Sequence, residues 1–102
     1  MTMNVLIVDD NHAAAELLQE LLELDGHTVR CAFTGREALE AAGAGHFPIA
    51  LIDLSLPDLP GTEVARRLRE ANPGGLLVAV SGFDRTDVPG ADAPGLFDHF
   101  LR

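Results

Sequence analysis

The sequence predicts an α/β protein built on a parallel sheet, and two features of its pattern carry that prediction. Short apolar runs alternate with longer segments in which apolar residues recur at helical spacing, so strands and helices alternate along the chain. Several runs are aliphatic at nearly every position, which is typical of strands covered on both faces. Connections of a few residues between such elements favour parallel strands joined by right-handed crossovers.

Length and composition limit the classes of protein that fit. The 102 residues match one domain of ordinary size, so we expect residues 1–102 to form a single domain. Sixteen acidic against seven basic residues give a net charge of −9, which argues against direct binding to nucleic acid or to an anionic membrane. No secretory signal or membrane-spanning run is recognisable. With Cys31 as its single cysteine, the chain is expected in the cytoplasm.

The first strand and the first helix have the clearest signals. Residues 5–8 are all branched and apolar, and they stop at the acid pair Asp9 and Asp10, which predicts a buried strand that ends in carboxylates. Asn11 can cap a helix over residues 12–24. We expect the core-facing stripe of this helix to consist of Ala14, Leu17, Leu18, Leu21 and Leu22.

A second strand and a second helix follow. Residues 28–32 alternate weakly between polar and apolar, which predicts a strand at the edge of the sheet. Residues 34–37 (TGRE) resemble a capping box, which opens a short helix. Gly43 and Gly45 are expected to end it.

The third strand is the second one to end in acid. Residues 49–53 form an apolar run that stops at Asp53, and the segment after it is rich in turn-forming residues. Thr62 can then cap a third helix, which the sequence NPGG at 72–75 closes.

The last part of the chain departs from this regularity. Residues 76–81 predict a fourth buried strand, which ends in the hydroxyl of Ser81. A fourth helix is due over residues 84–95, but two Pro-Gly pairs interrupt it. Residues 97–101 predict a fifth short strand, and the printed sequence stops at Arg102 with no helix after it.

The acids at the strand ends predict a cation site. Parallel neighbouring strands bring their carboxyl ends to one crevice, so Asp9, Asp10 and Asp53 are expected to meet there. Three close carboxylates repel one another, and a hard divalent ion such as Mg²⁺ offsets their charge and leaves an aspartate able to attack phosphorus. The alternative is that each acid is an ordinary turn or cap residue.

Three segments together resemble the receiver domain of two-component response regulators, of the chemotaxis-regulator type: residues 5–11 (VLIVDDN), 51–61 (LIDLSLPDLPG) and 78–82 (VAVSG). The resemblance covers essentially the whole chain. It implies a flavodoxin-like, doubly wound parallel sheet of five strands in the order 2-1-3-4-5. The fourth helix would be degenerate here, and the fifth would be absent.

The resemblance also implies a role in a phosphorelay from histidine to aspartate. Asp53 would accept the phosphoryl group from a histidine kinase or a histidine phosphotransfer protein. Ser81 would hydrogen-bond that group, and Phe100 occupies the position of the family's switch aromatic. The Mg²⁺ ligands implied by the family are Asp9, Asp10, Asp53 and the backbone carbonyl of Ser55.

Departures from the family pattern leave an alternative open. The family's lysine would come directly after Arg102, and missing helices should leave the first and fifth strands poorly covered. Exposed apolar surface attracts partners, so we expect an oligomer, a homodimer in the simplest case. The alternative function is a degenerate receiver that acts as a phosphate-independent interaction module. We expect no enzyme with a separate substrate, because Ser55 stands where aspartyl phosphatases usually carry a second acid.

Overall fold

A five-stranded parallel sheet forms the centre of the computed structural model, which describes residues 3–80 and 96–101, the last two by their backbone only. The strands are β1 (Asn4–Val8), β2 (Thr28–Ala32), β3 (Ile49–Asp53), β4 (Leu76–Val80) and β5 (His99–Leu101). The helices are α1 (His12–Leu24), α2 (Gly35–Ala44) and α3 (Gly61–Ala71). The strand order β2-β1-β3-β4-β5 confirms the predicted topology.

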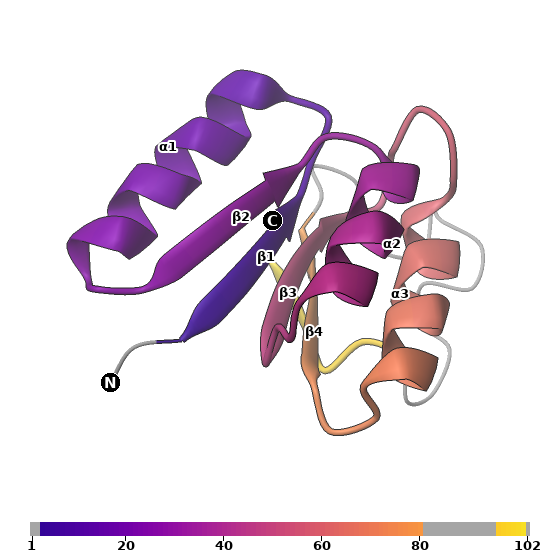
Figure 1. Cartoon of the computed structure of the whole chain (residues 1–102). Helices are drawn as coiled ribbons and strands as arrows, with labels where there is room; N and C mark the ends of the chain where they lie inside the picture. The colour runs from indigo at the N-terminus through magenta and orange to yellow at the C-terminus, as the bar shows by residue number, and fades with distance from the viewer. Residues whose placement is uncertain (1–2, 81–95, 102) are drawn as a thin grey trace.

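Helices cover both faces of the sheet (Figure 1). Helix α1 packs over β1 and β2 on one face, and α2 and α3 lie together on the other. Strand β1 is buried between these layers: Leu6 and Val8 belong to the core under α2 and α3, while Val5 and Ile7 face α1. The expectation of a poorly covered first strand is therefore wrong, because Val5 and Ile7 are buried on the face that α1 covers.

Helix α1 turns to the sheet a face that only partly matches the predicted one, since Leu18 and Leu22 pack as expected. Its core contacts come from Ala15, Leu18 and Leu22. Leu17 and Leu21 are 59% and 56% exposed, so their placement in the core stripe is wrong. Apolar residues occupy more than one side of this helix, and a 3.6-residue period allows either side to face the sheet. Contact with Val5, Ile7 and Val29 of the sheet determines which side of the helix is buried.

The helix starts agree only partly with the predicted caps. Asn11 Oδ1 accepts a hydrogen bond from the N–H of Ala14 at 3.1 Å, as expected. Thr34 Oγ1 accepts one from Glu37 at 3.1 Å, which confirms the second cap. Thr62 does not cap α3. That helix begins at Gly61, and the Cβ of any larger residue there would collide with the carbonyl of Asp53.

The end of α2 agrees only in part with the prediction, which named both Gly43 and Gly45. The helix continues through Gly43 and ends at Ala44, with Gly45 as its C-cap. A glycine inside a helix costs only about 1 kcal/mol relative to alanine, so the packing of Ala38 and Ala41 in the core outweighs it.

Strand β5 is held at its start by a network of charged and backbone groups. It is shorter than predicted, beginning at His99, because Asp98 uses its side chain to accept the N–H of Leu77 at 2.8 Å while its own N–H donates to the carbonyl of Leu77. Arg69 of α3 donates to Asp98 Oδ2 at 2.8 Å, to the carbonyl of Leu96 at 3.1 Å and to that of Gly75 at 2.6 Å. Arg69 therefore joins α3 to the beginnings of β4 and β5.

Some predictions lie outside the residues that the structure describes. These are Ser81, the side chain of Phe100, the degenerate fourth helix and the absence of a fifth. Within residues 3–80 and 96–101, no helix has the length and apolar character that crossing a membrane requires.

Candidate functional site

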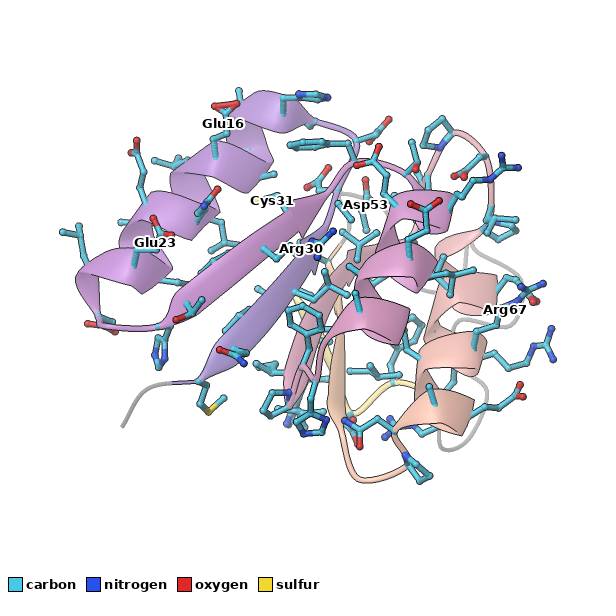
Figure 2. All side chains as sticks on the ribbon, viewed as in Figure 1. Glu16, Glu23, Arg30, Cys31, Asp53 and Arg67 are labelled. Carbon is cyan, nitrogen blue, oxygen red and sulfur yellow. The ribbon has the colours of Figure 1, made fainter. Side chains whose placement is uncertain are left out.

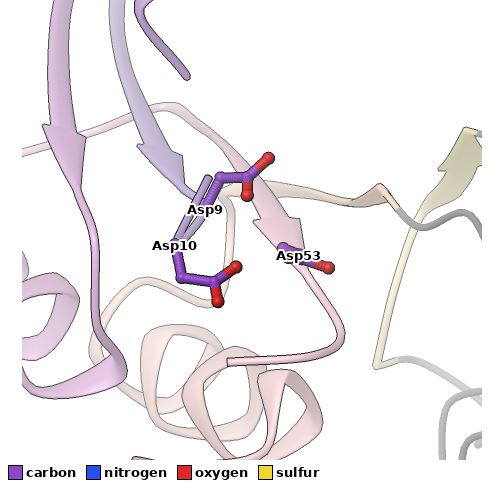
Figure 3. A group of neighbouring side chains, drawn as sticks. All are labelled: Asp9, Asp10 and Asp53. Carbon is purple, nitrogen blue, oxygen red and sulfur yellow. The ribbon is translucent and has the colours of Figure 1, made fainter. Parts of the chain in front are cut away.

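Three aspartates meet at the carboxyl edge of the sheet (Figure 3). Asp9 and Asp10 directly follow β1, and Asp53 is the last residue of β3. These strands are parallel neighbours, with Val8 beside Ile52, so the residues that follow come out at the same level. One carboxylate oxygen from each aspartate lies within 4.8 Å of the other two. The convergence predicted from the sequence is therefore present in the structure.

Backbone groups orient two of the three carboxylates. Asp9 Oδ1 accepts the N–H of Asn11 at 2.9 Å, and its own N–H donates to the carbonyl of Ala32 at 3.0 Å. Asp53 Oδ1 accepts the N–H of Ser55 at 3.1 Å. Asp9 and Asp53 are half-buried and Asp10 is exposed. The site is therefore open to solvent on the side of Asp10.

The electrostatics of the cluster disfavour three negative charges. Burial, followed by the charges of Asp9 and Asp10, raises the pKa of Asp53 to about 6, although the N–H of Ser55 acts in the opposite direction. The arginine ion pairs among the described residues all lie elsewhere, on Glu63, Glu70 and Asp98. No described side-chain cation therefore offsets the repulsion at this edge.

The donor set fits a hard divalent cation. All three side chains present carboxylate oxygens, which Mg²⁺ and Ca²⁺ prefer, and one or two carboxylates with several waters are typical of Mg²⁺. Burial and, after it, the charges of Asp9 and Asp10 raise the pKa of Asp53, so a cation at this position would favour its charged form. Asp53 lies at the end of its strand (Figure 2), and the exposed Ser55 follows in the loop after β3, hydrogen-bonded to it.

A stacked pair of rings beside the cluster was not foreseen. His12 at the start of α1 and Phe33 after β2 have parallel rings, 8° apart in orientation, with centroids separated by 3.8 Å. The stack joins the turn that carries Asp9 and Asp10 to the turn after the edge strand. The sequence gives no sign of this contact, because His12 and Phe33 become neighbours only when β1 and β2 pair in the sheet.

Comparison with known proteins gives one consistent result. The family model for the response regulator receiver domain matches residues 5–98. The response regulator MprA of Mycobacterium ulcerans is 34% identical over 95 residues, which cover 91% of this chain and 41% of that protein. The chain thus spans less than half the length of the curated relatives that it matches first.

Solved structures agree with this match. A CheY-like receiver domain from Methylobacillus flagellatus superposes with a TM-score of 0.87 at 36% identity, covering 100% of this chain and 86% of that one. A response regulator protein from Burkholderia pseudomallei superposes with a TM-score of 0.89 at 29% identity, covering 97% of this chain and 58% of that one. The latter structure contains a phosphorylated aspartic acid and a calcium ion.

Proposed function

Because this chain belongs to the response regulator receiver domain family, we propose that residues 1–102 are a phosphoacceptor unit of a histidine-to-aspartate phosphorelay, phosphorylated at Asp53. One observation carries the proposal: three carboxylates lie within 4.8 Å of one another at the ends of β1 and β3. Repulsion between these carboxylates lowers the stability of the fold. Such clusters are common at sites where a bound cation neutralises the charge and the carboxylates take part in the chemistry.

The chemistry assigned to Asp53 is a phosphoryl transfer. One carboxylate oxygen of Asp53 forms a bond to phosphorus, while the bond between phosphorus and a nitrogen of the donor's phosphohistidine breaks. The nitrogen keeps the electron pair, and the product is an acyl phosphate. The attacking carboxylate must be ionised, so a pKa of about 6 leaves Asp53 mostly charged at neutral pH.

Mg²⁺ is the proposed cofactor. Asp9, Asp10 and Asp53 would hold it with the backbone carbonyl of Ser55, and when bound it supplies charge stabilisation to the transferring group. Asp9 is already oriented by the N–H of Asn11, and Asp53 by that of Ser55. Two of the carboxylates therefore need little reorganisation to bind an ion.

Two residues outside the described side chains complete the proposal. Ser81 directly follows Val80, the last residue of β4, in the sequence, and β4 pairs with β3, the strand that ends at Asp53. A phosphoryl group adds about −1.5 to −2 charges and strong acceptor oxygens, which a hydroxyl can donate to. Phe100, on β5, is the proposed switch aromatic that responds to Ser81.

The donor is proposed to dock on the outer side of α1. Leu17, Leu21 and Leu24 are 59%, 56% and 84% exposed, and their spacing of four and three residues aligns them in one stripe. Helix α1 starts two residues after Asp10, so a protein on this stripe can present its phosphohistidine to the site. Glu16 and Glu23 lie on the same helix as the leucine stripe (Figure 2).

The charges of these two glutamates would repel a second copy of the chain, so we assign the stripe to a histidine kinase or phosphotransfer protein rather than to a homodimer. A histidine kinase takes its phosphoryl group from ATP, so we propose that the exchange takes place in the cytoplasm.

Intact mass spectrometry after incubation with acetyl phosphate, with and without Mg²⁺, tests the central proposal. We expect a gain of one phosphoryl group that needs Mg²⁺, that is absent in Asp53→Ala and that persists in Asp25→Ala, an exposed acid at the end of α1. Absence of phosphorylation in a folded protein would contradict the proposal. It would favour the alternative of a phosphate-independent interaction module.

The docking surface has its own test. Leu21→Gln should slow transfer from a phosphorylated histidine phosphotransfer protein that is active on the wild type, and leave phosphorylation by acetyl phosphate unchanged. Leu76→Gln is the matched control, because Leu76 is an exposed leucine outside α1, at the first position of β4. Equal transfer to the Leu21→Gln variant and the wild type would exclude this stripe. Sedimentation of the wild type at several concentrations then decides whether a homodimer forms elsewhere.

A further inference from the structure

The carboxylate of Asp58 joins two segments that are far apart in the sequence. Asp58 lies in the loop between β3 and α3 and accepts hydrogen bonds from Gly35 at 2.7 Å and Arg36 at 2.9 Å, the first two residues of α2. A third N–H, that of Leu59, donates to it at 2.9 Å. These three bonds lower the pKa of Asp58, with the bond from Arg36 contributing most. The carboxylate therefore fastens the loop to the N-terminus of α2.

Close packing reinforces the same contact. Gly35 approaches Leu59 and Val64 so closely that a Cβ at this position would lie 2.9 Å from the Cβ of Leu59 and 3.0 Å from Val64 Cγ2. At the other end of the loop, Gly61 lies against the carbonyl of Asp53 and donates its N–H to the carbonyl of Leu54 at 3.3 Å. The loop is thus held at Asp58 and at Gly61.

Ser55 lies in this loop, between Asp53 and the two attachment points. It is exposed, and its N–H donates to Asp53 Oδ1 at 3.1 Å. This single bond gives Ser55 little independent support, so its backbone position depends on how the rest of the loop is held. Displacement of the loop would shift the backbone of Ser55 and break its hydrogen bond to the carboxylate of Asp53.

We propose that Asp58 is a positioning residue for the metal and phosphoryl site, which acts by fixing the backbone of Ser55 beside Asp53. The inference rests on the proposed function, because it takes the Ser55 carbonyl as a Mg²⁺ ligand. Asp58 itself contacts neither the ion nor the phosphoryl group in this assignment.

Helix capping alone is the competing explanation, and the chain offers a matched variant to separate the two. Helix α2 has a side-chain cap of its own, since Thr34 Oγ1 accepts the N–H of Glu37 at 3.1 Å. Thr34→Ala removes a cap from the same helix end without touching the loop. Asp58→Ala removes bonds from that helix end and also frees the loop. A pure capping role predicts that the two variants behave alike.

The experiment measures Mg²⁺ affinity by isothermal titration calorimetry and exchange of the Ser55 amide by NMR in the metal-free protein, for wild type, Thr34→Ala, Asp58→Ala and Asp58→Asn. Both alanine variants should melt at lower temperature. Of these two variants, only Asp58→Ala should bind Mg²⁺ more weakly, by about tenfold, and exchange the Ser55 amide faster. Losses of this size are typical when a residue that orients a metal ligand, without binding the metal itself, is removed. Asp58→Asn retains an acceptor for Gly35 and Leu59, so it should recover part of the affinity.

The possible outcomes separate the inference from the proposal beneath it. Wild-type Mg²⁺ affinity and wild-type Ser55 exchange in Asp58→Ala would overturn the positioning role while leaving the metal site intact. Equal loss of affinity in Thr34→Ala would also overturn it, in favour of capping. Failure of the wild type to bind Mg²⁺ would overturn the proposed function, and the inference with it.

Discussion

Two aspartates at opposite ends of the parallel strands have opposite electrostatic environments. Asp53 ends β3 beside two other acids, and burial with their charges raises its pKa to about 6. Asp98 precedes β5 beside Arg69, and the hydrogen bonds from Arg69 and from the N–H of Leu77 lower its pKa. One carboxylate is thus disfavoured in its charged form and the other is favoured in it.

The difference separates charges that stabilise the fold from charges that belong to the proposed site. At the Asp98 edge the ion pair with Arg69 connects α3, β4 and β5, so the charge contributes to stability. At the Asp53 edge the cluster destabilises the metal-free protein, since nothing among the described side chains neutralises it. Active sites commonly retain groups of this kind, because a ligand provides the missing charge.

The largest effect is expected from removing the charge of Arg69. Arg69→Leu should lower the free energy of unfolding by about 2–3 kcal/mol, because Asp98 loses its cation and two half-buried carbonyls lose a donor. Arg67→Leu is the matched control on α3, since Arg67 forms an exposed pair with Glu63 that should contribute little to stability. Urea unfolding measures both, and equal effects would contradict the distinction.

An intermediate effect of opposite sign is expected at Asp53. Its folded pKa is raised, so the stability it contributes is complete below the ordinary value near 4 and is lost as pH rises through about 6. Asp53→Asn should therefore stabilise the metal-free protein at pH 7.5 by about 1.5–2 kcal/mol after allowance for solvent screening, and by close to nothing at about pH 3, where the carboxyl is protonated in both states.

Urea unfolding in a chelator across this pH range measures the effect at Asp53. Asp25→Asn, the same substitution at an exposed acid at the end of α1, is the control outside the cluster. Addition of Mg²⁺ should reverse the advantage of Asp53→Asn, because the ion neutralises the wild-type cluster. A gain that does not vary with pH would contradict the assignment of the destabilisation to the charge of Asp53.

The smallest effect is expected at Asp98 in acid. Its folded pKa is lowered, so its contribution is present above the ordinary value near 4 and is lost as pH falls through the folded value. Asp98→Asn should be less stable than the wild type at pH 6, and the two should converge as the pH falls below 4. Thermal unfolding followed by circular dichroism over pH 3–6 checks the convergence, and parallel curves would show that Asp98 acts without its charge.

Much of the fold and the core of the candidate site could be predicted, for local reasons. Residues 5–8 have no polar member, so only burial on both sides suits them, and the run stops at Asp9 because the chain leaves the sheet there. The same argument applies to β3 and Asp53. Parallel pairing then brings these ends together whatever the intervening helices contain.

The sequence by itself therefore determined the α/β alternation, the strand order through its family resemblance, and the convergence of Asp9, Asp10 and Asp53. Only the tertiary structure decided that Asp58 receives the N–H groups of α2, that Arg69 reaches Asp98, and that Leu17 lies on the outside of α1. The reason is physical: a strand end is marked by local chemistry, whereas these contacts join groups separated by 23 and 29 residues, or depend on which side of a broadly apolar helix packs on the sheet.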